Sequence, residues 1–111
     1  MSRTLISTGR EWLSGIDGVK GKKANTLCVV HFERSVPSAV TAGGVGIGIF
    51  TLPDGWRPAY YTRMVGRSGS GVVGVDASNT DGIVRVYHIG SNVAKGERVN
   101  GTLVYYTGDP R

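Results

Sequence analysis

The sequence predicts an all-β protein: an antiparallel β-sandwich arranged as a jelly roll or Greek key, with a barrel as the alternative. About seven short runs of β-forming residues follow one another at short spacing, with turn residues between them. No window sustains the i, i+3, i+4, i+7 apolar pattern of an amphipathic helix. The 18 glycines among 111 residues have no G-x-y period, so they indicate turns and closely approaching strands. This length suits a single domain over residues 1–111.

The strands are expected where β-formers concentrate or alternate with polar residues. Residues 1–25 are the least regular part, and they predict an N-terminal arm or short edge strands. Residues 35–44 predict a loop, because Pro37 and two adjacent glycines interrupt them. The predicted strands cover residues 26–33, 45–52, 59–66, 72–77, 83–89 and 102–108, with 90–101 as a long polar loop or a weak strand.

The predicted strand over 45–52 has an unusual second face. Val45, Ile47 and Ile49 alternate with Gly46 and Gly48, so one face is apolar and the other is bare backbone. Such a face lets an aromatic ring, a neighbouring chain or a ligand come close.

The sequence NTDG over 79–82 is the clearest hairpin turn, because it joins two β-rich runs. In the second run Val84 and Val86 share one face, while Arg85 and Tyr87 share the other. This pattern is typical of an antiparallel sheet with one face in water.

Adjacent tyrosines occur twice, at Tyr60 and Tyr61 and at Tyr105 and Tyr106. Neighbours on a strand face opposite sides of the sheet. One member of each pair is therefore expected in the core, and the other is free for solvent, a partner subunit or a sugar.

The segment LPDGWRP over 52–58 predicts a sharp corner between two strands. Pro53 fixes φ and suits the second position of a turn, while Pro58 forces Arg57 into an extended conformation. Leu52 and Trp56 can then cap one end of the domain. A structural role is favoured over direct ligand contact by Trp56 or Arg57.

The net charge is +5 and the isoelectric point is near 9.7, which favours a partner bearing phosphates or carboxylates. The densest basic cluster, KGKK at 20–23, is interpreted as a solvated turn rather than a nucleic-acid patch. The single cysteine, Cys28, excludes an intrachain disulfide and a Cys-based zinc site, and it is expected to be a buried thiol.

The chain contains no signal-peptide run and no stretch long and apolar enough to span a membrane. It is therefore expected to be made in a cytoplasm, with no membrane insertion. A function outside the cell would require release of the protein by another route, such as lysis.

No arrangement of residues predicts catalysis, a metal or a cofactor. His31 and His88 lack the partner spacing of a metal site. The glycine-rich segments complete neither a dinucleotide fingerprint nor a P-loop, and no nucleophile elbow precedes a helix. Two acidic pairs could be imagined as a glycosidase pair, but nothing distinguishes them: Asp76 with Asp81, and Glu33 with Asp54. The protein is therefore expected not to be an enzyme.

The order of three motifs resembles a known family. TLPDGWRP at 51–58, NTDGIVRVY at 79–87 and GTLVYYT at 101–107 follow one another as in the C-terminal head domains of phage tail fibres and baseplate receptor-binding proteins. The resemblance covers about residues 44–107. Trp56 stands where tyrosine is commoner in that family, and the chain lacks the shaft that usually holds three heads together.

The resemblance implies a β-sandwich head that assembles as a homotrimer and recognises saccharide on a bacterial surface. The implied partners are that saccharide, two further copies of the chain and other tail or baseplate proteins, and the implied location is the virion. Nucleic acid is not an expected partner. The candidate saccharide contacts are Trp56, Arg57, Tyr61, Arg63, Tyr87 and His88.

Two alternatives remain open from the sequence. The first is a structural fibre tip or decoration module that does not bind a receptor. The second is a basic β-barrel that binds single-stranded nucleic acid, which requires the tyrosines to lie on one basic face.

Overall fold

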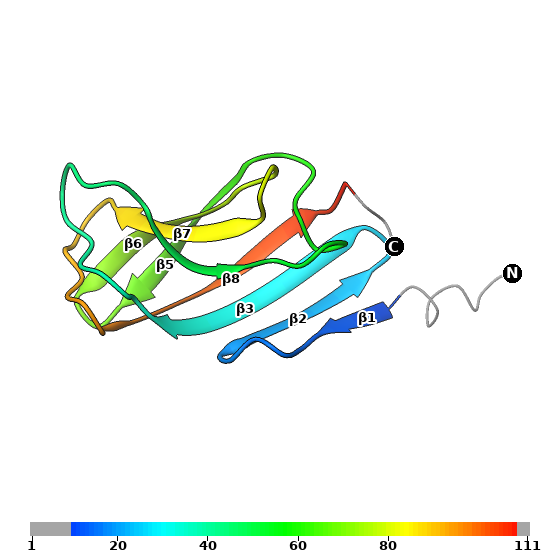
Figure 1. Ribbon diagram of the computed structural model, residues 1–111, viewed down its shortest axis with the longest axis horizontal. Helices are drawn as coiled ribbons and strands as arrows, with labels where there is room; N and C mark the ends of the chain where they lie inside the picture. Colours follow the sequence, from blue (N-terminus) through cyan, green and yellow to red (C-terminus); the bar gives the residue numbers. More distant parts are fainter. Residues whose placement is uncertain (1–9, 109–111) are drawn as a thin grey trace, which may run out of the picture.

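The computed structural model describes residues 10–108, which form eight β-strands (Figure 1). The strands are β1 (Arg10–Leu13), β2 (Val19–Ala24), β3 (Leu27–Ser35), β4 (Ile47–Thr51), β5 (Thr62–Ser68), β6 (Gly71–Ala77), β7 (Ile83–His88) and β8 (Arg98–Tyr106).

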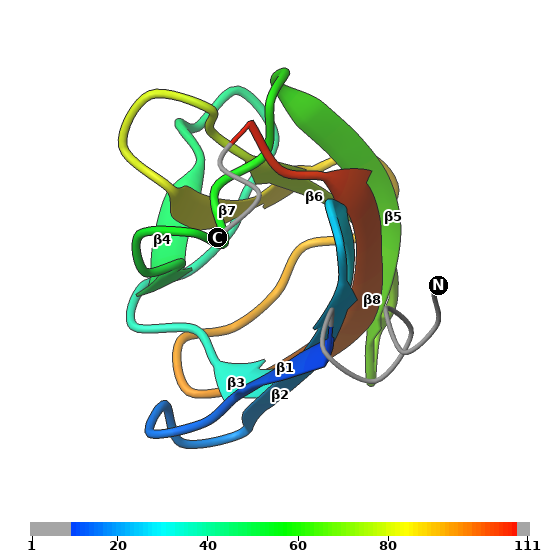
Figure 2. The same ribbon diagram turned by 90° about the vertical axis from the view of Figure 1, so that its right-hand side faces the viewer.

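All eight strands belong to one antiparallel sheet, in the order β1-β2-β3-β8-β5-β6-β7-β4. The sheet curls strongly, so that β4 and β7 lie across the interior from β2 and β3 (Figure 2). Strand twist and a register shift in β4, between Gly48 and Phe50, favour this curvature. The result is a half-barrel.

The all-β, antiparallel class is confirmed, and residues 10–108 contain no helix. The strands form a single curled sheet, where the sequence favoured the two layers of a sandwich. No helix in the described part of the chain is long and apolar enough to cross a membrane.

Most predicted strands are found, with shifted ends. Strand β5 begins at Thr62, three residues later than expected, and β8 begins at Arg98, four residues earlier. Residues 10–13 and 19–24 form β1 and β2, while residues 1–9 lie outside the described part. The interpretation of KGKK as a turn is wrong, because these residues belong to β2.

The core lies on the concave face of the sheet. In β3, Cys28, Val30 and Phe32 are buried, as alternation requires. The Phe32 ring meets Phe50 of β4 across the interior, with 5.6 Å between ring centroids.

Strand β4 departs from the predicted alternation. Val45 is exposed, while Ile49 and its neighbour Phe50 are both buried. The register shift between Gly48 and Phe50 is the reason, because a bulge lets two consecutive residues point towards the core.

The predicted hairpin between β6 and β7 is confirmed. Side chains replace backbone partners in its turn: the Ile83 N–H donates to Asp81 Oδ1 at 3.0 Å, and the Thr80 N–H donates to Ser78 Oγ at 3.2 Å. Gly82 has φ of 73°, a conformation that favours glycine.

The 52–61 corner crosses one end of the half-barrel, and its predicted capping role is confirmed. Leu52 and Trp56 are buried. The Trp56 N–H donates to the Pro53 carbonyl at 2.9 Å, so Pro53 occupies the first position of the turn, not the second as predicted. Gly55 supplies the positive φ of 85° that this turn requires.

Buried donors hold the corner against the sheet. Tyr105 Oη in β8 donates to the Trp56 carbonyl at 2.6 Å, and Thr107 Oγ1 donates to the Arg57 carbonyl at 2.7 Å. Burial raises the pKa of the Tyr105 phenol far above its ordinary value, so it remains a donor at any physiological pH.

Lys23 is the least expected of these donors. Its side chain is 1% exposed, and its ammonium donates to the Gly55 carbonyl at 2.6 Å. The same Nζ lies 5.2 Å from the centroid of the Trp56 ring. A lysine from β2 therefore holds the corner by a charged hydrogen bond and a cation–π contact.

We expect Lys23→Met to destabilise the protein by about 1–3 kcal/mol, because it leaves the Gly55 carbonyl buried without its donor. Urea unfolding followed by tryptophan fluorescence measures the change. The exposed neighbour Lys22→Met is the control, with an expected change within about 0.5 kcal/mol. Equal stability of the two variants would contradict a structural role for the Lys23 ammonium.

Candidate functional site

The convex face of the sheet, called the outer face below, carries the candidate site. Paired residues in neighbouring strands point to the same face, so the registers place side chains of β5, β6 and β7 together. One row contains Arg63, Asp76 and Arg85, and the next contains Val65, Gly74 and Tyr87.

An arginine lies between two tyrosines on this face. The guanidinium carbon of Arg63 is 5.5 Å from the ring centroids of both Tyr61 and Tyr87. Each distance is within the range of a cation–π contact. Arg63 belongs to β5 and Tyr87 to β7, which are not adjacent in the sheet, and Tyr61 immediately precedes β5.

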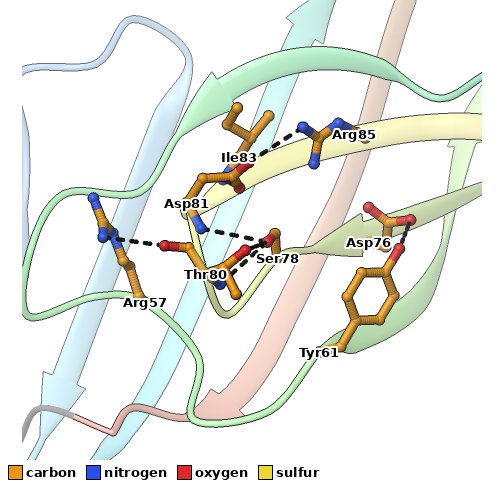
Figure 3. A network of polar contacts seen from close by, with 8 residues as sticks. All are labelled: Arg57, Tyr61, Asp76, Ser78, Thr80, Asp81, Ile83 and Arg85. Atoms are coloured by element: carbon orange, nitrogen blue, oxygen red, sulfur yellow. Dashed lines mark hydrogen bonds and ion pairs between the residues drawn. The ribbon is translucent and has the colours of Figure 1, made fainter.

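Asp76 is the carboxylate of the site, and it is only 6% exposed. The Tyr61 hydroxyl donates to its Oδ2 (Figure 3). Its Oδ1 is buried and has no hydrogen-bond partner among the described residues. A buried carboxylate oxygen without a donor is costly, so the site retains one unsatisfied acceptor.

The hydrogen bond to Asp76 shifts the titration of Tyr61. Donation to the carboxylate is the largest cause that raises the pKa of the Tyr61 phenol, followed by burial and by the negative charge of Asp76. The Tyr61 hydroxyl and the nearby Tyr87 raise the pKa of Arg63. Tyr61 is therefore a neutral donor, and Arg63 a permanent cation.

Gly74 provides the space on which Tyr87 lies. A Cβ atom at position 74 would clash with the Tyr87 ring. The flat stacking of Tyr87 beside Arg63 thus depends on a glycine in the neighbouring strand.

Arg85 belongs to the edge of the site. Its Nη2 lies 3.4 Å from Asp81 Oδ2 in the hairpin turn (Figure 3). The Asp81 pKa is lowered, chiefly by the Ile83 N–H and with smaller contributions from Ser78 and Arg85. Arg85 is therefore paired, whereas Arg63 has no carboxylate ion pair among residues 10–108.

The structure brings together three of the six candidate residues, Tyr61, Arg63 and Tyr87. Trp56 is 5% exposed inside the corner, and His88 lies on the concave side of β7, in register with buried Val73. Arg57 pairs with Asp54 at 3.4 Å and also donates to the Thr80 carbonyl at 3.4 Å. These three residues therefore lie away from the Tyr61 site or are occupied in the fold.

The tyrosine pairs behave differently from each other. Tyr105 is buried and Tyr106 is exposed, which confirms the alternation predicted for that strand. The expectation that Tyr60 or Tyr61 packs in the core is wrong, because both are exposed. They precede β5, which begins at Thr62, so strand alternation does not apply to them.

The sequence did not predict the role of Asp76, which stood there only as one of several acids. The alternation in VVGVDA could have found it, because this pattern puts Asp76 on the same face as Gly74. Nothing in the sequence alone links that face to Tyr61.

The described residues contain no group of three or more His, Cys, Asp or Glu side chains that could hold a metal ion. The site instead offers two aromatic rings, the Arg63 cation and a carboxylate acceptor. This arrangement can bind a polar ligand that has an apolar face.

The fold and the site together define a half-barrel β-domain with an aromatic and charged site on its outer face. Comparison of the chain with protein-family models finds no match. Comparison with curated proteins finds no match either.

We expect Asp76→Asn to lower the Tyr61 pKa towards its ordinary value, because the variant removes the charge that favours the protonated phenol. NMR titration of tyrosine ring carbons measures the shift. Tyr106, on the outer face of β8, serves as the internal reference. An unchanged Tyr61 titration would show that the hydroxyl does not donate to Asp76 in solution.

Proposed function

We propose that this protein is a phage receptor-binding head domain that binds bacterial surface saccharide at the Tyr61 site. The observation that carries the proposal is the position of Arg63 between Tyr61 and Tyr87, next to the unsatisfied carboxylate of Asp76. The site is exposed at its aromatic residues and fixed at its carboxylate.

The chemistry of the site fits a sugar. Tyrosine rings contact the apolar face of a pyranose, while arginine N–H groups and a carboxylate bind its hydroxyls. Asp76 Oδ1 accepts a hydrogen bond from a ligand hydroxyl when the side chains above it move to admit one. The ligand thereby satisfies the acceptor that the fold leaves open.

Two of the three family-like motifs, the corner and the hairpin, contact each other, and this supports the phage assignment. The Leu52 N–H of the corner donates to the Gly82 carbonyl of the hairpin at 2.8 Å. Arg57 donates to the Thr80 carbonyl of the same hairpin. Motifs that occur together in one family would be expected to form one structural unit. The two halves of the curled sheet would correspond to the layers of a sandwich head.

A homotrimer is part of the proposal. Val65, Val104 and Tyr106 expose apolar surface in the middle of the outer face, on β5 and β8. Exposed apolar groups gathered on one face favour association. Three sites on one particle would raise the avidity for a cell surface. Light scattering is expected to give a species of three times the 11.7 kDa mass of the chain.

We expect Arg63→Ala to weaken binding of the protein to susceptible bacterial cells by about tenfold, the equivalent of about 1.4 kcal/mol. The variant removes the cation from between the two rings. Gly74→Ala should have a similar effect without removing any functional group, since its methyl displaces the Tyr87 ring. Flow cytometry with fluorescently labelled protein measures both.

Two matched control variants distinguish an effect on the Tyr61 site from an effect on the fold or on the overall charge. Arg67→Ala removes an exposed arginine from the same strand and face, and Gly90→Ala adds a methyl group where only ordinary contacts are close. Both should bind as the parent protein does. Equal losses in Arg67→Ala and Arg63→Ala would mean that the general positive charge, not the Tyr61 site, binds the cells.

Single-stranded nucleic acid is the second candidate, because one observation favours it. Tyr61, Tyr87 and Tyr106 share the outer face with Arg63 and Arg67. This is the basic, aromatic face that stacking on bases requires. Binding to an oligonucleotide that falls steeply with salt, combined with no binding to any host cell, would favour this function over the first.

A further inference from the structure

The outer face also carries a hollow near the β1 edge of the sheet, away from the Tyr61 site. Its volume is about 440 Å³, and it lies over β1, β2 and β3. Strands β8 and β5 follow β3 in the sheet. At ~4.8 Å between strands, the hollow and the Tyr61 site are on the order of 15 Å apart. Its lining residues are Trp12, Leu13, Ser14, Lys20, Gly21, Lys22, Val29 and His31.

The walls of this groove are apolar. Trp12, Lys22 and Val29 form one row across the three strands. The Trp12 side chain is 72% exposed. Because the Trp12 indole is exposed on β1, a strand of four residues, it contributes little to the core. Exposed aromatic surface of this size is typical of a contact site.

The rim of the groove is cationic. Lys22 Nζ lies 6.0 Å from the centroid of the Trp12 ring, and Lys20 stands opposite His31 in the register. Among the described residues, neither lysine forms an ion pair with a carboxylate. The nearest acid on the outer face of β3 is Glu33, which pairs with Arg98 at 3.6 Å. Within the part of the chain that the structure describes, no ion pair therefore offsets the positive charge of Lys20 and Lys22.

We propose that this groove is a second saccharide subsite, which binds a sugar ring bearing a carboxylate or phosphate. The proposal rests on the proposed function in that the ligand is a saccharide, but it concerns different residues. The apolar face of the ring stacks on Trp12 beside Val29, and the acidic group lies between Lys20 and Lys22. His31, whose Nδ1 is 3.0 Å from Thr102 Oγ1, keeps its Nε2 for a ligand hydroxyl.

A second copy of the chain fits this groove less well. A two-fold contact through one patch would bring Lys20 and Lys22 of both copies together. An acidic ligand supplies the charge that the groove lacks, which makes charge complementarity the deciding argument.

Trp12 provides a direct probe of the groove. The only other tryptophan, Trp56, is buried, so acrylamide quenches mainly Trp12. The probe ligand is hexagalacturonate, and its fully methyl-esterified form is the neutral control. We expect hexagalacturonate to protect Trp12 from quenching at low ionic strength, and the ester to bind at least about tenfold more weakly. In Trp12→Phe the protected component of the signal should be absent.

Substitutions locate the binding and separate it from the Tyr61 site. Lys22→Ala and Lys20→Ala should each weaken protection by about tenfold, whereas Lys95→Ala, an exposed lysine elsewhere, should leave it unchanged. Arg63→Ala should also leave it unchanged. The proposed function fails if Arg63→Ala binds cells normally, and this outcome does not alter the protection of Trp12.

Three results would contradict the proposal of a second subsite. These are no protection by hexagalacturonate, equal protection by the ester, and protection that survives loss of both lysines. Light scattering is recorded on the same samples. Protection that appears only together with a larger oligomer would assign the groove to contacts between copies of the chain. Protection by acetate as strong as that by hexagalacturonate would reduce the site to one for small anions, which also contradicts the proposal.

Discussion

The hydrogen bonds that hold the 52–61 corner across one end of the curled sheet are the constraint on which the core depends. A half-barrel leaves its concave face open to water unless other segments cover its ends. Donors from Lys23 and Tyr105, on β2 and β8, reach the carbonyls of Gly55 and Trp56. Because a buried carbonyl without a donor is costly, these bonds fix where the corner lies. Trp56 can then seal the interior.

The opposite end is closed by two connections that pair with each other. Val40 and Val93 exchange backbone hydrogen bonds of 2.8 and 2.9 Å between the β3–β4 and β7–β8 connections. Arg34 adds two bonds to the Ile49 carbonyl. With both ends occupied by structural contacts, the concave side has little surface left for a ligand. Exposed aromatic residues and cations lie instead on the outer face, and this is where we propose that ligands bind.

Local pattern was enough to predict the class, the β6–β7 hairpin and the buried Cys28, because each depends on neighbours in the sequence. Local pattern could not predict the burial of Lys23, since a lysine at a core position interrupts the hydrophobic pattern and so favours the prediction of a turn. Its burial depends on Trp56, which lies 33 positions further along the chain. The Tyr61 site has the same difficulty: Asp76 could be assigned to a face, but its contact with Tyr61 follows only from the pairing of β5 with β6.

The two sites on the outer face differ in their charge balance. This difference predicts which site contributes selectivity to the proposed binding and which contributes electrostatic attraction. At the first site Arg63 stands opposite Asp76 in the register of β5 and β6, so the two opposite charges lie near each other without forming an ion pair. We therefore expect this site to select ligands by shape and hydroxyl geometry. In the groove, Lys20 and Lys22 have no such counterpart among the described residues. Screening at physiological ionic strength, with a Debye length of about 8 Å, weakens the exposed lysines most. We therefore expect the specificity of the proposed saccharide binding to depend on the Tyr61 site, and the groove mainly to add attraction for acidic polymers.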